Sequence, residues 1–126
     1  MQQVLWIAAG GALGSALRYL IGVLTVRWWG GHFPYGTLAV NIVGAFFLGA
    51  VMFAGSKPGL LSPSMRLTIG TGLLGGFTTY SSFAFETLQM IQRSAWFGAI
   101  AYAAGSAVAA VSAAGLGYGL MRAVTR

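Results

Sequence analysis

The chain has 126 residues, of which 6% are charged, with seven Lys or Arg residues, a single acidic residue and a net charge of +6. Soluble domains carry roughly 25% charged residues, whereas this chain is 57% hydrophobic and contains 20 glycines. The composition argues against a soluble enzyme and a disordered tail. It also argues against a nucleic-acid binder, because the cations are scattered along the chain. It predicts one small transmembrane domain, residues 1–126.

Long apolar stretches separated by short polar loops predict an all-α membrane protein. A bilayer core needs about 20 apolar residues per helix, and the charge-poor stretches accommodate four such helices. Arg27-Trp28-Trp29 is typical of the membrane interface, and Ser62-Pro63 is typical of a helix start, with serine as the N-cap and proline in the first turn. The predicted spans are residues 4–26, 35–54, 63–93 and 95–121.

The third predicted span is too long for one straight helix. Residues 63–93 would extend roughly 46 Å if helical throughout, which exceeds the roughly 30 Å of the hydrocarbon core. Gly75-Gly76 followed by Thr78 and Thr79 is a poor helix interior, so we predict a break near residues 75–79. Unwound backbone exposes carbonyls that can hold a cation and a helix N-terminus that can attract an anion. The alternative is a continuous, glycine-tolerant packed helix.

Small residues recur at four-residue spacing in the first and fourth spans. This pattern lets helix backbones approach closely, so we interpret it as a packing surface, within or between subunits, without chemistry of its own. The residues are Gly10, Gly14, Ala101, Gly105, Ala109, Ala113 and Gly117.

The charges outside the spans give only a weak signal for orientation. Four spans put both termini and the second loop on one side of the membrane, and either orientation, or both, agrees with the small excess of cations there. That side carries Lys57, Arg66, Arg122 and Arg126, and the other carries Arg27 and Arg93.

Two polar side chains stand inside predicted spans. Arg18 lies well within the first span, and a central arginine costs about 2.5–3.5 kcal/mol on insertion scales. It either extends toward the Trp28–Trp29 interface or supplies a positive charge beside an ion path. Asn41, in the middle of the second span, either makes an interhelical hydrogen bond or offers its amide donors to an ion.

Hydroxyl and aromatic side chains accumulate in the third and fourth spans. Hydroxyls, an amide and the positive edges of aromatic rings can replace water around an anion, although the aromatic pair also suits simple core packing. Glu86, the only acid, is a proton site, an arginine partner or an acceptor for neighbouring hydroxyls. The other candidates are Thr79, Tyr80, Ser82, Phe83, Tyr102 and Ser106.

The sequence argues against a metal site built from side chains. It has no cysteine, one histidine and one acidic residue, too few for a metal cage, so only backbone carbonyls remain for holding a cation. The N-terminus lacks the cationic region of a signal peptide, so we expect the first apolar segment to be retained.

Four motifs resemble the Fluc (CrcB) family of fluoride channels, and the resemblance extends over essentially the whole chain. The stretches Gly36–Gly44 and Gly72–Glu86 are the most specific, and Gly10–Tyr19 and Tyr102–Ser106 match the same family. The resemblance implies a dual-topology, antiparallel homodimer of four-helix subunits with a broken third helix. It also implies two fluoride pores, each lined by both subunits, and a structural sodium ion (Na+) at the dimer centre.

By motif matching, the resemblance assigns the sodium-binding backbone carbonyls to Gly75 and Thr78. Arg18 matches an arginine assigned to the vestibule or to stability. Tyr80 departs from the family, because phenylalanine is usual at that position. The implied fluoride pore residues are Asn41, Thr79, Tyr80, Ser82, Phe83, Glu86, Tyr102 and Ser106.

The resemblance thus implies a passive fluoride channel of the cell (inner) membrane that lets fluoride leave the cytoplasm and catalyses no reaction. Its expected partners are the fluoride ion, the lipid bilayer and a second copy of the chain, and no nucleic acid. Two alternatives stay open. One is a small dual-topology, proton-coupled multidrug-type exporter that uses Glu86, and the other is a structural subunit that docks through its small-residue stripes.

Overall fold

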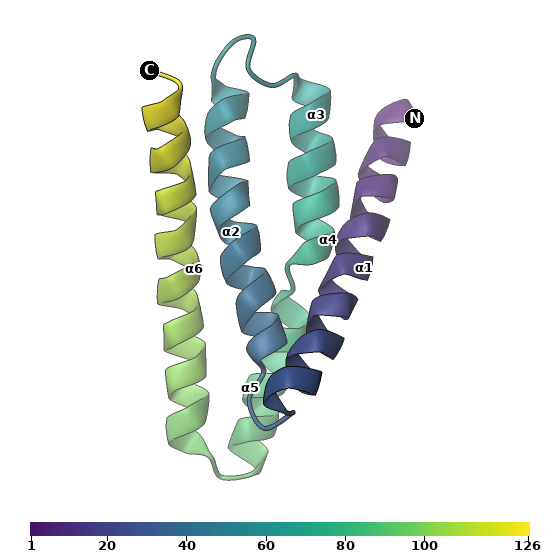
Figure 1. The fold of residues 1–126 in the computed structure, drawn as a ribbon. Coiled ribbons are helices and arrows are strands. Elements are labelled where there is room, and N and C mark those ends of the chain that lie inside the picture. Colours follow the sequence, from purple (N-terminus) through teal and green to yellow (C-terminus); the bar gives the residue numbers. More distant parts are fainter.

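Helices joined by short links account for nearly the whole of the computed structural model, which describes residues 1–126 (Figure 1). No strand is present, so the expected all-α class is confirmed. Three helices, α1, α2 and α6, are long and apolar enough to cross a membrane. The elements in chain order are α1 (Gln2–Trp29), α2 (Tyr35–Ser56), α3 (Pro63–Leu67), η1 (Thr68–Leu74), α4 (Gly75–Phe77), α5 (Tyr80–Gln92) and α6 (Trp96–Val124).

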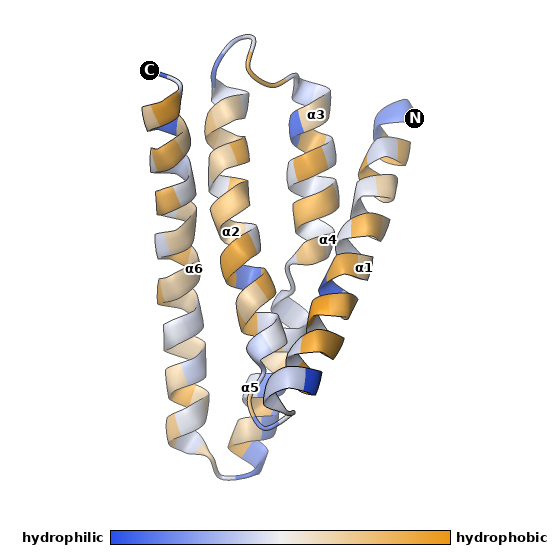
Figure 2. Ribbon diagram, viewed as in Figure 1, coloured by the Kyte–Doolittle hydropathy of each residue, from blue (hydrophilic) through white to orange (hydrophobic).

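The chain reverses direction after α1, after α2 and after α5, and both termini lie at the same end of the molecule (Figure 1). Figure 2 shows hydrophobic residues along most of the helices, with strongly hydrophilic ones confined to short patches. Only 15 of 126 residues are buried within the chain, and large apolar side chains such as Leu5 and Phe97 are exposed. So much exposed apolar surface requires lipid or another protein to cover it, as expected of a membrane protein.

The third predicted span is broken, as the sequence predicts, and the continuous-helix alternative is wrong. Thr78 (φ −82°, ψ 159°) and Thr79 (φ −150°, ψ 120°) are extended and separate α4 from α5. Thr79 also caps α5, because its Oγ1 accepts a hydrogen bond from the N–H of Ser82 at 3.2 Å. Gly75 and Gly76 remain within α4, so the capping threonine, and not the glycine pair, marks the position of the break.

A seven-residue π-helix, η1, precedes α4 and was not expected from the sequence. It continues directly from α3 and into α4, so the backbone is helical from Pro63 to Phe77. π-helical turns are wider than α-helical turns, are rare, and occur frequently at functional sites. The widened turns therefore help to set the direction in which the end of α4 faces.

Glycines allow close backbone approach in two helix pairs, which confirms the packing interpretation for part of the small-residue pattern. Between α1 and η1, a Cβ at Gly14 would overlap the carbonyl oxygen of Leu73, and a Cβ at Gly10 would lie 2.8 Å from the carbonyl oxygen of Thr68. Between α2 and α6, a Cβ at Gly117 would overlap the carbonyl oxygen of Phe46. Around Gly105 the space is open within the chain.

Candidate functional site

The side chain of Asn41 binds the backbone of the break. Its Nδ2 donates to the carbonyl oxygen of Thr79 at 2.9 Å, and its Oδ1 accepts from the N–H of Thr79 at 2.7 Å. The two residues are 38 positions apart, so α2 is fixed to the start of α5 by one amide. Of the two alternatives for Asn41, the structure contains the interhelical hydrogen bond, and one amide N–H remains for another acceptor.

Arg18 turns toward the same region from α1. Its Nε donates to the carbonyl oxygen of Gly76 at 3.0 Å, and Ser15 Oγ donates to the same oxygen at 3.5 Å. The guanidinium therefore lies against the C-terminal end of α4, where a cation complements the partial negative charge of the helix. Extension toward the Trp28–Trp29 interface does not describe this side chain.

Glu86 accepts hydrogen bonds from hydroxyls on both neighbouring long helices. Thr37 Oγ1, on α2, donates to Oε1 at 2.6 Å, and the Tyr102 hydroxyl, on α6, donates to Oε2 at 2.7 Å. Neither partner is an arginine, so the third interpretation of Glu86, as an acceptor for hydroxyls, matches the structure. Thr37 is not among the predicted site residues, although it lies one helical turn before Asn41 on the same face.

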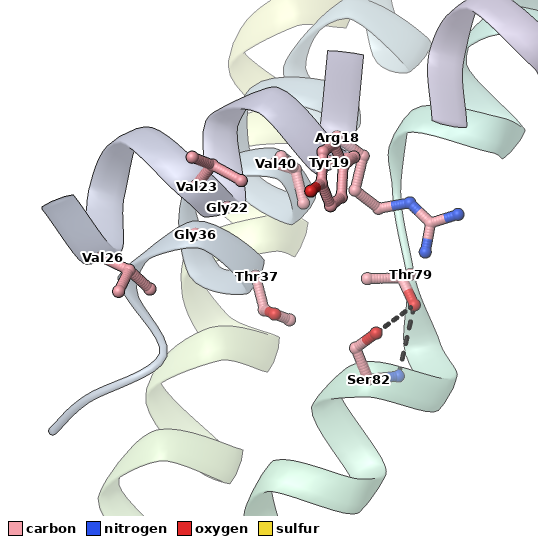
Figure 3. A pocket seen from close by; sticks show the side chains of 10 residues that line it. All are labelled: Arg18, Tyr19, Gly22, Val23, Val26, Gly36, Thr37, Val40, Thr79 and Ser82. Atoms are coloured by element: carbon pink, nitrogen blue, oxygen red, sulfur yellow. Dashed lines mark hydrogen bonds between the residues drawn. The ribbon is translucent and has the colours of Figure 1, made fainter. Parts of the chain in front are cut away.

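A cavity of about 480 Å³ lies between α1, α2 and the beginning of α5 (Figure 3). Its apolar wall includes Val23 and Val40. Thr79 Oγ1 donates to Ser82 Oγ at 3.1 Å, so two predicted hydroxyls lie together beside it. The polar residues of its wall are Arg18, Thr37, Thr79 and Ser82.

A second cavity, of about 350 Å³, brings the predicted aromatic residues next to the break. The ring centroids of Tyr80 and Phe83 are 5.6 Å apart, and those of Phe83 and Tyr102 are 5.3 Å apart. Tyr80 is 81% exposed. Ser106 Oγ is buried and makes no hydrogen bond within the chain. This cavity is lined by Asn41, Ala45, Leu48, Thr78, Thr79, Tyr80, Phe83, Ser106, Ala107 and Ala110.

The predicted pore residues thus gather around the break. Six of them line one or both of the two cavities, and the other two, Glu86 and Tyr102, belong to a hydrogen-bond group with Thr37. Hydroxyls and an amide predominate, and the one carboxylate is already occupied by two donors. The roles of these side chains toward an ion stay predictions. Ser15 was not anticipated at all, because nothing in its sequence neighbourhood indicates that it approaches Gly76.

The fold and the site define a small α-helical membrane protein whose interrupted apolar segment lies between two cavities, whose mainly apolar walls also carry hydroxyl, amide and guanidinium groups. The family model described as CrcB-like protein, Camphor Resistance (CrcB), matches residues 5–118, and the chain belongs to this family. The resemblance inferred from the sequence motifs is therefore confirmed.

The chain is similar over most of its length to proteins of several organisms. A protein of Sorangium cellulosum (strain So ce56) is 44% identical, with 93% of this chain and 92% of the relative aligned. A protein of Phenylobacterium zucineum (strain HLK1) is 45% identical, with 98% of both chains aligned. A protein of Roseiflexus sp. (strain RS-1) is 41% identical, with 94% of this chain and 96% of the relative aligned. Each of the three is named fluoride-specific ion channel FluC.

Proposed function

We propose that this chain is a passive fluoride channel of the cell (inner) membrane, through which fluoride leaves the cytoplasm. The observation that carries the proposal is the identity of 44–45% over more than nine-tenths of the chain to proteins named fluoride-specific ion channels. The donor-rich surroundings of the break support it, because hydroxyls and amide groups can replace the water of a small anion. The relatives are named as channels and not as enzymes, and no reaction is proposed.

The functional unit that we propose is an antiparallel homodimer in which each subunit crosses the membrane four times. The run from α3 to α5 is the fourth crossing, and the common end of both termini supports an even number of crossings (Figure 1). The exposure of Tyr80 beside the second cavity supports a partner, because a second copy would cover this ring and complete the cavity wall. The two-fold symmetry of such a dimer would make its pores an equivalent pair, and we propose that each of the two pores is lined by both subunits.

A structural sodium ion at the centre of this dimer fits the residues of the break. The carbonyl oxygen of Thr78 accepts no hydrogen bond within the chain, and Gly75 is exposed. No group of three His, Cys, Asp or Glu residues competes for a metal ion, and backbone carbonyls suit a hard cation. One chain would contribute the carbonyls of Gly75 and Thr78, and the partner would contribute the same pair.

Ion efflux from liposomes tests this proposal against the proton-coupled exporter. Purified protein is reconstituted in liposomes loaded with fluoride or chloride, and a fluoride- or chloride-selective electrode follows release after a potassium ionophore is added. We expect rapid fluoride release, negligible chloride release and no uphill movement when a pH gradient is imposed. Protein-free liposomes are the control. Release of neither anion, or uphill transport that depends on Glu86, would reject the channel.

A further inference from the structure

We infer that Asn41 and Arg18 are positioning residues that hold the two sides of the break, so that Asn41 acts on the pore through the backbone of Thr79. This inference rests on the proposed function only where it concerns ion flux. The hydrogen bonds that carry it belong to a single chain and do not depend on which ion passes.

The two bonds of Asn41 replace the helical bonds that the break removes. In a continuous helix the N–H of Thr79 would donate to the carbonyl of Gly75, but here it donates to Asn41 Oδ1. Because Thr79 is extended, its N–H and C=O face the same side, as in a hydrogen-bonded pair of β-strands. One side-chain amide can therefore satisfy both groups, which lipid cannot do.

Arg18 acts on the other side of the break. The last carbonyls of a helix have no intrahelical partner, and Gly76 stands in the last turn of the helical run that ends at Phe77. The bond from Arg18 Nε to Gly76 satisfies one of these carbonyls and brings a positive charge to the negative helix end. This arrangement explains how an arginine is accommodated in a span without an acidic partner.

Arg18 binds Gly76 and Asn41 binds Thr79, whereas the carbonyl of Thr78, which lies between these two residues, accepts no hydrogen bond within the chain. Thr79 is also the N-cap of α5, so the bonds from Asn41 fix the direction in which α5 begins. The rings of Tyr80 and Phe83 lie in the first turns of that helix. Loss of Asn41 would therefore displace the aromatic residues as well as remove an amide donor.

Amide hydrogen–deuterium exchange of the reconstituted protein separates this role from direct ion contact. In Asn41→Ala, we expect the amide of Thr79 to exchange about tenfold faster, since it loses its only acceptor. Ser106→Ala is the matched control, because Ser106 lines the same cavity but makes no bond to the break. It should lower fluoride flux and leave exchange across residues 78–82 unchanged.

Arg18→Gln tests the other side, with Arg27→Gln, near the end of the same helix, as its control. The Thr78 amide, which donates to Leu74 at 3.0 Å in the last turn before the break, should exchange about tenfold faster only in Arg18→Gln. Equal exchange in both variants and the parent would overturn the role of Arg18.

Asn41→Asp provides a second test in case Asn41→Ala does not assemble. The aspartate keeps an acceptor for the N–H of Thr79, so protection of that amide should persist while the donor to the Thr79 carbonyl is lost. If Asn41→Ala loses flux with unchanged exchange, or if Asn41→Asp exposes the amide, the positioning role is wrong. Absence of fluoride flux in the parent would reject the proposed function without affecting these exchange rates.

Discussion

The hydroxyl of Tyr102 donates a 2.7 Å hydrogen bond to Oε2 of Glu86, so the N-terminal part of α6 is joined to α5 through the only acid of the chain. Tyr102 is 2% exposed. The other carboxylate oxygen receives the hydroxyl of Thr37 from α2. One carboxylate therefore joins three helices, and its removal is expected to loosen all of them.

Tyr102→Phe and Glu86→Gln should destabilise the protein in a non-additive way. Tyr102→Phe removes the hydroxyl donor, and Glu86→Gln replaces the carboxylate by an amide, which is a weaker acceptor. A hydrogen bond of this kind contributes about 0.5–3 kcal/mol, so the double variant should lose about 0.5–2 kcal/mol less than the sum of the singles. Unfolding free energies in detergent measure the difference. Thr87→Val is the control partner for Tyr102→Phe, because Thr87 bonds only to Phe83 in its own helix. Additive losses for Tyr102 and Glu86 would contradict the coupling.

Phe83→Ile should abolish fluoride flux, whereas Tyr80→Phe should keep most of it. Isoleucine retains apolar bulk but has no positive ring edge to face an anion, and Tyr80→Phe keeps the ring that lies 5.6 Å from that of Phe83. Efflux from liposomes gives the two rates, and crosslinking of the dimer checks assembly. Parent-like flux in Phe83→Ile would assign the ring pair to packing alone.

Gly75→Val should weaken the dimer and reduce flux, and removal of sodium should have the same effect on the parent. Within one chain, a Cβ at Gly75 meets nothing closer than the carbonyl oxygen of Gly70 at 3.7 Å, and its φ of −64° suits any residue. A loss of dimer stability or of flux in Gly75→Val would therefore be caused by contacts of Gly75 with a second subunit or an ion, and not by contacts within the chain. Dimer dissociation is measured in sodium and in N-methylglucamine buffers. A Gly75→Val dimer as stable as the parent, or indifference to sodium, would contradict the central site.

Gly117→Ala should cost about 1–3 kcal/mol of stability, because its Cβ would overlap the carbonyl oxygen of Phe46 and force α2 and α6 apart. Gly119→Ala, two residues along the same helix, has open space within the chain and should be neutral or stabilising by up to about 1 kcal/mol. Thermal unfolding of the two variants is compared in the same detergent. Equal effects would show that close approach at Gly117 is unimportant.

Ser94→Gly should stabilise the turn between α5 and α6 by about 1 kcal/mol, because Ser94 has a left-handed φ of 59° that glycine adopts without strain. The N–H of Ala95 donates to the carbonyl of Met90 and that of Ser94 to Ile91, which is a Schellman C-cap. Thermal unfolding measures the gain, and Ser94→Val should show a loss. A lower melting temperature for the glycine variant would be inconsistent with this cap.

The sequence predicted the break but not what holds it. Glycine and threonine have local preferences that can be read without a structure, so the interruption near residues 75–79 was foreseeable. The partners of Asn41 and Arg18 lie 38 and 58 positions away, and such pairings depend on how the helices pack. η1 was missed because its residues carry no local signal that distinguishes a π-helix from an α-helix.

The length of η1 has a consequence for which changes the chain tolerates. Deleting one residue between Thr68 and Leu74 would let the segment relax toward α-helical geometry. A π-helical turn holds more residues than an α-helical turn, so this relaxation would keep the end of α4 close to its present orientation relative to α3. An insertion in η1 has no such compensation, because each added α-helical residue rotates the chain by about 100°. Thr79 would then face away from Asn41 even though every side chain of the break was retained. Insertions in η1 should therefore be more harmful than the deletion of one residue there.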